Sequence, residues 1–254
     1  MAKTVMRNFD DTTIICYFVE HLKNNGYPDI RIERIPDKEK VGGDKKKDID
    51  AIAGNFAIEH TSVDTIKNQT RDSARFLKVV KDLEAEISPK LNYRLNLTIP
   101  YEGIRKGQNW SSVSEALKQW IINTSPNLTD GRHIIDNASN IPFQFYARKA
   151  KERKPGLFFG RLSPDNNDFV DRLRNQIQRK AIKLKPYSVK GYQTILLLES
   201  DDIALMDEGI MLDGVRKSFN CQMPNGVNEI WYADTGISDN IVFNNFTEAI
   251  LKAI

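Results

Sequence analysis

The chain has 254 residues, of which 40% are hydrophobic and 28% charged, and its formal net charge is +3. This composition is typical of a globular protein with a hydrophobic core. The charge neither requires nor opposes a nucleic-acid partner. The two cysteines, Cys16 and Cys221, lack metal-type spacing, which argues against a zinc finger or a disulfide framework.

Hydrophobic segments give no indication of a membrane or of secretion. The first residues lack the apolar core of a signal peptide. The apolar run at 195–198 is far too short to cross a bilayer. We therefore expect a cytoplasmic protein with reduced thiols and no membrane contact.

The first third of the chain alternates between helical and extended patterns. Apolar residues recur at helical spacing before Gly26, and a charged connector over 36–47 carries Gly42-Gly43. Ser62 or Asp64 could cap the second helix. The predicted elements are, in order, a helix over 11–25, strands over 30–35, 48–53 and 56–61, and a helix up to residue 87.

The remainder continues the alternation without an internal repeat or a linker rich in Pro, Gly or Ser. The predicted elements are strands over 93–99, 143–147, 157–159, 192–198 and 229–233, and helices over 113–122, from about 167 to 184, 203–219 and 246–254. We expect an α/β fold in one domain over 1–254, with a core over 10–100 and a C-terminal α/β elaboration over 101–254.

An acidic hairpin stands out as the candidate site. Gly54-Asn55 suits a two-residue turn, which pairs Ala53 with Phe56 and fixes the register. One face of the hairpin is then mostly apolar, because side chains alternate along a strand. The other face gathers Asp48, Asp50 and Glu59.

Carboxylates directly opposed across two strands repel each other, so Asp50 beside Glu59 requires a compensating cation or a raised pKa. Mg²⁺ or Mn²⁺ suits such a set of oxygen ligands, to which the carbonyl of His60 could add. The alternative is a solvated acidic pair neutralised by the lysines at 45–47. The imidazole of His60 is expected on the apolar face, as a structural residue.

The order of these elements and residues resembles the core of the PD-(D/E)XK nuclease superfamily. The resemblance is carried by Glu20 on the first helix, Asp50 in Lys-Asp-Ile-Asp-Ala-Ile and Glu59 in Phe-Ala-Ile-Glu-His-Thr. It implies a restriction-endonuclease-like central mixed sheet flanked by helices. It also implies a Mg²⁺-dependent hydrolase of phosphodiesters, in which the metal activates a water.

One position departs from that pattern, because Thr61 stands where the superfamily has a lysine. A hydroxyl cannot replace the charge of an ammonium. Lys67, on the helix expected after Glu59, is our candidate substitute, and Lys180 is a more distant possibility. The resemblance thus predicts Asp50, Glu59 and Lys67 as catalytic residues, with Asp50, Glu59, Glu20 and Asp48 around the metal.

Basic residues elsewhere are candidates for binding nucleic acid, with DNA favoured over RNA. Arg172, Arg179 and Lys183 lie opposite the apolar stripe of their helix, and Arg148 and Lys149 begin a basic cluster. The alternative for both stretches is an ordinary solvated face.

Two rival functions stay open. A nuclease-like fold that has lost its lysine could be a binding module without catalysis. Gly42-Gly43 followed by Asp48 and Asp50 is similar to the nucleotidyltransferase pattern, although four residues are too few for the helix that normally presents the phosphates. Oligomeric state and sequence preference stay open as well.

Overall fold

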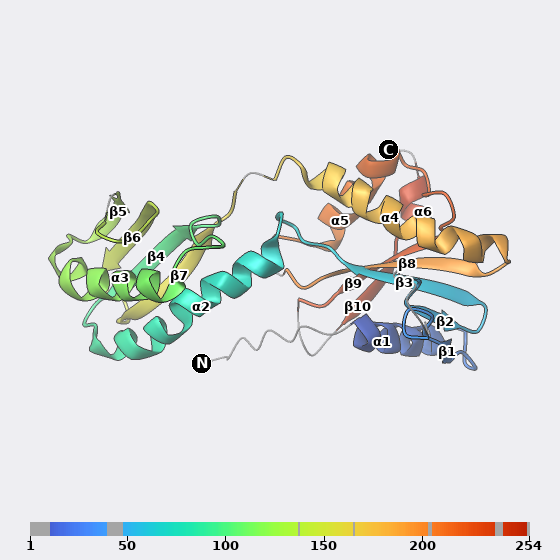
Figure 1. Cartoon of the computed structure of the whole chain (residues 1–254), viewed down its shortest axis with the longest axis horizontal. Helices are drawn as coiled ribbons and strands as arrows, with labels where there is room; N and C mark the ends of the chain where they lie inside the picture. Colours follow the sequence, from blue (N-terminus) through green and yellow to red (C-terminus); the bar gives the residue numbers. More distant parts are fainter. Residues whose placement is uncertain are drawn as a thin grey trace. The chain divides into compact units, whose positions relative to one another are not determined.

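The computed structural model describes residues 11–39, 48–136, 138–164, 166–202, 205–236 and 241–252. The chain divides into two compact units (Figure 1): unit 1 combines Met1–Thr65 with Asn167–Ile254, and unit 2 is Ile66–Asn166. This division differs from the single domain expected from the sequence. The last third of the chain is no elaboration, because its strands complete the sheet that contains the hairpin.

Unit 1 is a mixed sheet with helices on both faces. Its elements are α1 (Asp11–Asn24), β1 (Ile32–Arg34), β2 (Ala51–Ala53), β3 (Phe56–Ser62), α4 (Phe169–Val189), β8 (Gln193–Ser200), α5 (Glu208–Phe219), β9 (Glu229–Asp234), β10 (Val242–Asn245) and α6 (Thr247–Leu251). The strand order is β1-β2-β3-β8-β9-β10. β3, β8 and β9 run parallel, whereas β1, β2 and β10 pair antiparallel with their neighbours.

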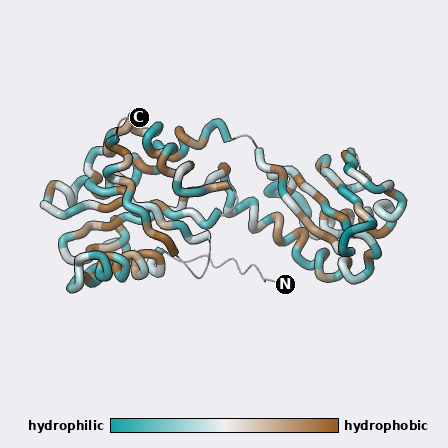
Figure 2. Tube along the Cα trace, turned by 180° about the vertical axis from the view of Figure 1, so that it is seen from behind, coloured by the Kyte–Doolittle hydropathy of each residue, from teal (hydrophilic) through white to brown (hydrophobic). Residues whose placement is uncertain are grey.

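Each face of this sheet buries its own hydrophobic core. α1 packs on the face that carries Ala51 and Ile58, and α4, α5 and α6 cover the face that carries Ile52 and Ala57. Hydrophobic stretches follow the strands of the unit, as Figure 2 shows. A sheet covered on both faces explains the continuous apolar run in β8.

Unit 2 is a smaller sheet with helices packed on one face. Its elements are α2 (Gln69–Ile87), η1 (Ser88–Lys90), β4 (Arg94–Pro100), α3 (Trp110–Asn123), η2 (Ser125–Asn127), β5 (Gly131–Ile135), β6 (Phe145–Ala150) and β7 (Gly156–Leu162). The strand order is β5-β6-β4-β7, with β4 and β7 parallel. Both units are therefore α/β with mixed sheets flanked by helices, as expected at this coarse level.

The predicted turn and register of the hairpin are confirmed. Gly54 has a φ of +52°, and Ala53 pairs with Phe56, Ile52 with Ala57 and Ala51 with Ile58. The first strand is shorter than predicted, since β2 begins only at Ala51. Asp48 is the cause: its backbone N–H donates to Asp37 Oδ1 and its own Oδ1 accepts from Ile49 N, so side chains replace the strand ladder.

Two predicted helices begin later than expected. The one placed after the hairpin begins at Gln69, with Asn68 in a left-handed conformation before it, so neither Ser62 nor Asp64 caps it. Ser62 instead donates its hydroxyl to Glu199 Oε2. The other is α5, which begins at Glu208 because Asp207 accepts from Ile210 N as an N-cap.

Candidate functional site

Two lysines and a buried carboxylate form the centre of the candidate site in unit 1. Glu59 lies in β3, and its side chain is fully buried on the face covered by α4. Lys180 Nζ donates to Glu59 Oε1 at 2.6 Å, and Lys183 Nζ donates to the same oxygen at 2.7 Å. The two lysines are three positions apart on α4, so one helix face presents both ammonium groups.

The two carboxylate oxygens of Glu59 differ in their hydrogen bonding. Glu59 Oε2 is buried and has no hydrogen-bond partner among the described residues. Asp50 lies nearby, with its Oδ2 accepting from His60 N at 2.8 Å. Burial and then the negative charge of Asp50 raise the pKa of Glu59, although both lysines act in the opposite direction. The site therefore holds a buried carboxylate with one oxygen that has no hydrogen-bond partner among the described residues, a feature that requires an explanation.

Backbone and side-chain contacts fix the lysines to the start of the hairpin. Lys183 Nζ also donates to the carbonyl of Asp48 at 2.8 Å, and Lys180 Nζ to the carbonyl of His60 at 2.8 Å. Tyr187, one turn further along α4, donates its hydroxyl to Asp48 Oδ1 at 3.0 Å. Burial and this hydrogen bond to Asp48 raise the pKa of Tyr187 to about 12, so the phenol stays protonated. The carbonyl of His60, considered from the sequence as an additional metal ligand, thus accepts from an ammonium.

His60 points to the opposite face of the sheet, as predicted from strand alternation. Its Nδ1 lies 3.1 Å from Asp11 Oδ1, and its Nε2 lies 2.9 Å from Glu199 Oε2. Burial lowers the pKa of His60, but these two hydrogen bonds outweigh it and raise the pKa to about 9. His60 is therefore a buried imidazolium held between two carboxylates, apart from the face that carries Glu59.

Glu20 lies apart from this cluster, and Lys67 belongs to the other unit. Glu20 lies on α1, which packs on the other face of the sheet, and its side chain is 60% exposed in an ion pair with Lys23. Lys67 belongs to unit 2 and lies exposed in the turn before α2. Thr61, at the position of the missing lysine, accepts from Gln176 Nε2 at 2.7 Å. Lys180, the more distant possibility considered from the sequence, contacts Glu59 together with Lys183.

The residues predicted to bind nucleic acid fall into three different environments. Arg172 donates to the carbonyls of Asp64 and Thr65 at 3.0 and 2.7 Å, which ties the end of β3 to α4. Arg179 is exposed. Arg148 and Lys149 are neighbours on β6 of unit 2 and point to opposite faces of its sheet.

Lys149 cannot serve as a phosphate contact. It is 2% exposed, and its Nζ donates to the carbonyls of Ser125, Pro126 and Leu128 at 3.1, 2.6 and 3.0 Å. Burial lowers its pKa. No pattern in the sequence indicates this role, because the three carbonyls belong to a turn more than twenty positions away.

Sequence reasoning also missed the role of Lys183 and of Glu199. Lys183 was predicted on a phosphate-binding row but contacts Glu59. Glu199 ends β8 and binds His60, Ser62 and Thr235. The only available signal for Glu199 was a carboxylate at the end of a buried strand. Its partners are more than thirty positions distant, so spacing along the chain could not reveal them.

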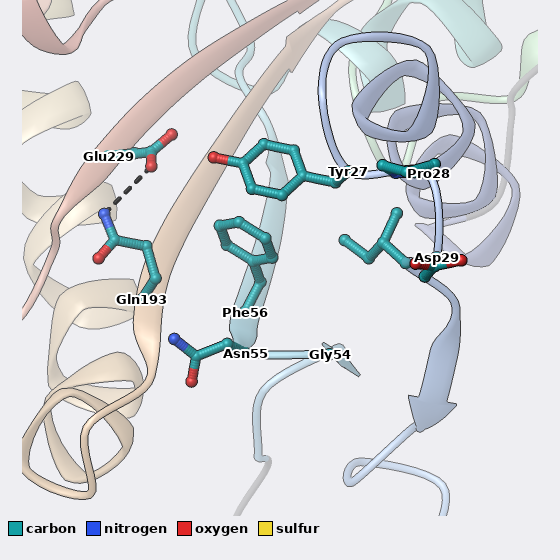
Figure 3. Close-up of a pocket in the computed structure, with 9 residues that line it drawn as sticks. Tyr27, Pro28, Asp29, Gly54, Asn55, Phe56, Gln193 and Glu229 are labelled. Atoms are coloured by element: carbon teal, nitrogen blue, oxygen red, sulfur yellow. Dashed lines mark hydrogen bonds between the residues drawn. The ribbon is translucent and has the colours of Figure 1, made fainter.

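A separate pocket opens at the turn end of the hairpin (Figure 3). It has a volume of about 530 Å³ and lies between the loop after α1, Gly54 and the first residues of β8 and β9. The ring of Tyr27 meets that of Phe56 edge-on at 5.0 Å, and Gln193 Nε2 donates to Glu229 Oε1. None of the predicted site residues lines this pocket.

In the described part of the chain, no group of three or more His, Cys, Asp or Glu side chains is arranged to hold a metal ion. Gly42 and Gly43, the glycines of the nucleotidyltransferase pattern, lie outside the described residues. No helix of the described residues is both long and apolar enough to cross a membrane.

Comparison of the chain with protein-family models, with curated proteins and with solved structures finds no match.

Proposed function

We propose that unit 1 is a metal-dependent nuclease that hydrolyses phosphodiesters of nucleic acid, with Lys180 in the role expected of Lys67. The observation that carries the proposal is the buried and unpartnered Oε2 of Glu59, with Asp50 beside it. The element order also supports it, since α1, β1, β2 and β3 lead into one mixed sheet that α4 covers.

The donor set fits a hard divalent ion with two protein carboxylates. Glu59 Oε2 and the carboxylate of Asp50 would hold Mg²⁺ or Mn²⁺, which prefer oxygen ligands. Such an ion would lower the pKa of a bound water and neutralise charge on the phosphodiester. Glu20 takes no part in this version of the site, because it is exposed and paired with Lys23. Asp48 contributes through its contacts with Lys183 and Tyr187.

The lysines supply positive charge that Thr61 cannot. Lys180 is held by Glu59 Oε1 and the carbonyl of His60, and its side chain is 24% exposed. Its ammonium is thus fixed beside the carboxylate and still open to a substrate. A charged ammonium positions a phosphate oxygen or a water by donating hydrogen bonds. Lys183 is held in the same way and reinforces the positive charge.

A second candidate function rests on the same lysines. Because two ammonium groups already neutralise Glu59, the cluster could bind the phosphate of a nucleic acid without any metal. In that case the unit is a nuclease-like binding module without cleavage, and Mn²⁺ has no effect on it.

Metal-dependent stabilisation separates the two candidates. An ion that binds only the folded state raises stability by about 2.7 kcal/mol at a concentration of 100 Kd. The wild-type chain should melt at a higher temperature in millimolar Mn²⁺, whereas Asp50→Asn and Glu59→Gln should not respond. Asn can still accept from His60 N, so Asp50→Asn should fold without metal. A wild-type melting curve indifferent to both Mg²⁺ and Mn²⁺ would contradict the metal site.

Cleavage assays then test the lysine. Lys180→Met should reduce Mg²⁺-dependent cleavage of DNA or RNA by about 10²–10⁴-fold, the usual size of a proton-transfer or positioning role. Lys67→Ala is the matched control, since it removes an exposed lysine from unit 2. A stronger loss in Lys67→Ala than in Lys180→Met would return the assignment to Lys67. Binding without cleavage in the wild type would favour the binding module.

A further inference from the structure

One face of the sheet in unit 2 lies open. The helices of this unit pack on the face that carries Leu95, Leu97 and Phe145. Along β4, the central strand, every second residue on the other face is half-buried. That face also carries exposed large apolar side chains, with Ile134 at 59%, Leu162 at 44% and Phe158 at 39% exposure. We call it the open face. These side chains lie on β5 and β7, the two outer strands of the sheet.

The register places a basic row across this face. One row of paired residues crosses all four strands. It contains, in order, Arg132 of β5, Arg148 of β6, Asn96 of β4 and Phe158 of β7. Three strand spacings make the row about 14 Å wide. Two arginines are thus directly opposed on neighbouring strands, an arrangement that destabilises a sheet unless an anion lies between them. Among the residues that the structure describes, Arg148 has no carboxylate partner.

Aromatic rings stand beside these cations. The next row contains Tyr146 of β6, and the guanidinium of Arg132 lies over its ring at 4.5 Å. The guanidinium of Arg94 lies over the ring of Phe158 at 4.0 Å. A guanidinium stacked in this way keeps its N–H edge available to a phosphate.

A groove of about 360 Å³ runs between these side chains. Its walls include Arg94, Arg132, Arg148 and Arg153, together with Tyr146. None of the residues that line it is acidic. The carboxylate Asp136 lies beyond the end of β5 and is bonded by Gln144. The groove therefore concentrates positive charge at a surface that also offers π-faces.

We infer that the open face of unit 2 binds single-stranded nucleic acid. Arginines would neutralise its phosphates, and Tyr146 and Phe158 would stack on its bases. A flat sheet that presents aromatic rings is a recurring platform for unpaired bases, whose faces a duplex conceals. The inference does not depend on the nuclease site, because it concerns other residues in another unit and requires no metal.

The test is binding of the full chain to labelled oligo-dT and oligo-U in EDTA, which prevents any metal-dependent cleavage. The double variant Arg132→Gln/Arg148→Gln should weaken binding at least tenfold. It should also make the dependence of log K on log salt shallower by about 1.4, at roughly 0.7 per lost phosphate contact. Lys81→Ala is the matched control, because Lys81 is exposed on α2, which packs on the opposite face. It should leave affinity within twofold.

The aromatic variants distinguish stacking from general attraction between charges. Tyr146→Leu and Phe158→Leu should each weaken binding by about 5- to 100-fold with an unchanged salt slope, the usual effect of losing one stacked base. Equal affinity for duplex DNA and for single strands, or an unchanged affinity of the aromatic variants, would overturn the inference.

Stability provides a second readout that does not depend on the ligand. Because Arg132 and Arg148 repel each other across the strands, Arg148→Gln should fold at least as stably as the wild type in the absence of nucleic acid. It should then gain less thermal stability from oligo-dT or oligo-U than the wild type does. A marked loss of stability in the free Arg148→Gln variant would show that the arginine is structural, and would also overturn the inference.

Discussion

The shared acceptor in the candidate site leads to a prediction about non-additivity. Lys180 and Lys183 both donate to Glu59 Oε1, at 2.6 and 2.7 Å, and the carboxylate itself is fully buried. Removal of either lysine leaves the other in place. Lys180→Met and Lys183→Met should therefore each cost only about 1 kcal/mol, because the partial exposure of both side chains reduces the usual value of about 1.5–3 kcal/mol for a hydrogen bond to a charged group.

The double variant should lose more stability than the two single variants lose together. With both lysines gone, Glu59 becomes a buried charge without a partner, a change that costs about 3–5 kcal/mol. The coupling in a double-mutant cycle should therefore exceed about 1 kcal/mol. Hydrogen exchange of the β3 and β8 amides is the suitable assay, because it reports on unit 1 alone. In a Glu59→Gln background, the same lysine changes should have little effect.

The sign of the pH dependence follows from the same carboxylate. Without the lysines, the pKa of Glu59 in the folded state rises further, because burial and Asp50 both act in that direction. A raised pKa in the folded state means that stability is fully present below the unfolded pKa and is lost as pH rises through the folded one. The double variant should therefore recover stability towards pH 4. Additive single effects, or a double variant whose deficit does not change with pH, would refute this account.

Three further predictions test the fold. His60→Gln should flatten the pH dependence of stability measured by urea titration. The pKa of His60 is about 9 in the folded state and near 6.5 in the unfolded state, so the charged imidazole stabilises the fold fully below pH 6.5. This contribution of about 3 kcal/mol is lost as pH rises through 9. Lys149→Met should destabilise unit 2 by roughly 2–4 kcal/mol in hydrogen exchange, because the carbonyls of Pro126 and Leu128 lose the ammonium as donor, whereas that of Ser125 keeps a bond from Leu128 N. Gly214→Ala should lower the melting temperature at a cost of about 1–3 kcal/mol, since its Cβ would lie 2.7 Å from Phe169 in the packing of α4 on α5. An unchanged pH profile, unchanged exchange or an unchanged melting temperature would contradict the respective prediction.

Local signals made much of the fold predictable. The alternation on both sides of Gly54-Asn55 fixed the register of the hairpin, because a two-residue turn leaves only one pairing. The helical stripe from Phe169 to Leu184 likewise matches the buried face of α4. Two of the edge strands were missed: β5 and β10 bury little surface, so their sequences lack the apolar alternation of a covered strand.

The candidate site was only partly predictable for a physical reason. Asp50 and Glu59 belong to one hairpin, so their proximity follows from local geometry. The lysines that reach Glu59 come from α4, more than 120 positions later. Their position depends on the parallel pairing of β3 with β8, and no pattern in the sequence specifies which two distant strands become neighbours. Lys67 was predicted as the lysine beside Glu59 because it lies in the segment expected to form the next helix along the chain.

The parallel pairing of β3 with β8 has a consequence for synthesis on the ribosome. Residue 60 pairs with residue 197, so β3 emerges long before its neighbour exists. At about 5–20 residues per second, roughly 7 to 27 s separate the two strands. Unit 2 is translated entirely within that interval and can fold first. Meanwhile the edge of β3 that will pair with β8 remains unpaired. The nascent chain therefore passes through a stage at which β3 is open to aggregation or chaperone binding, and slower translation would lengthen that stage.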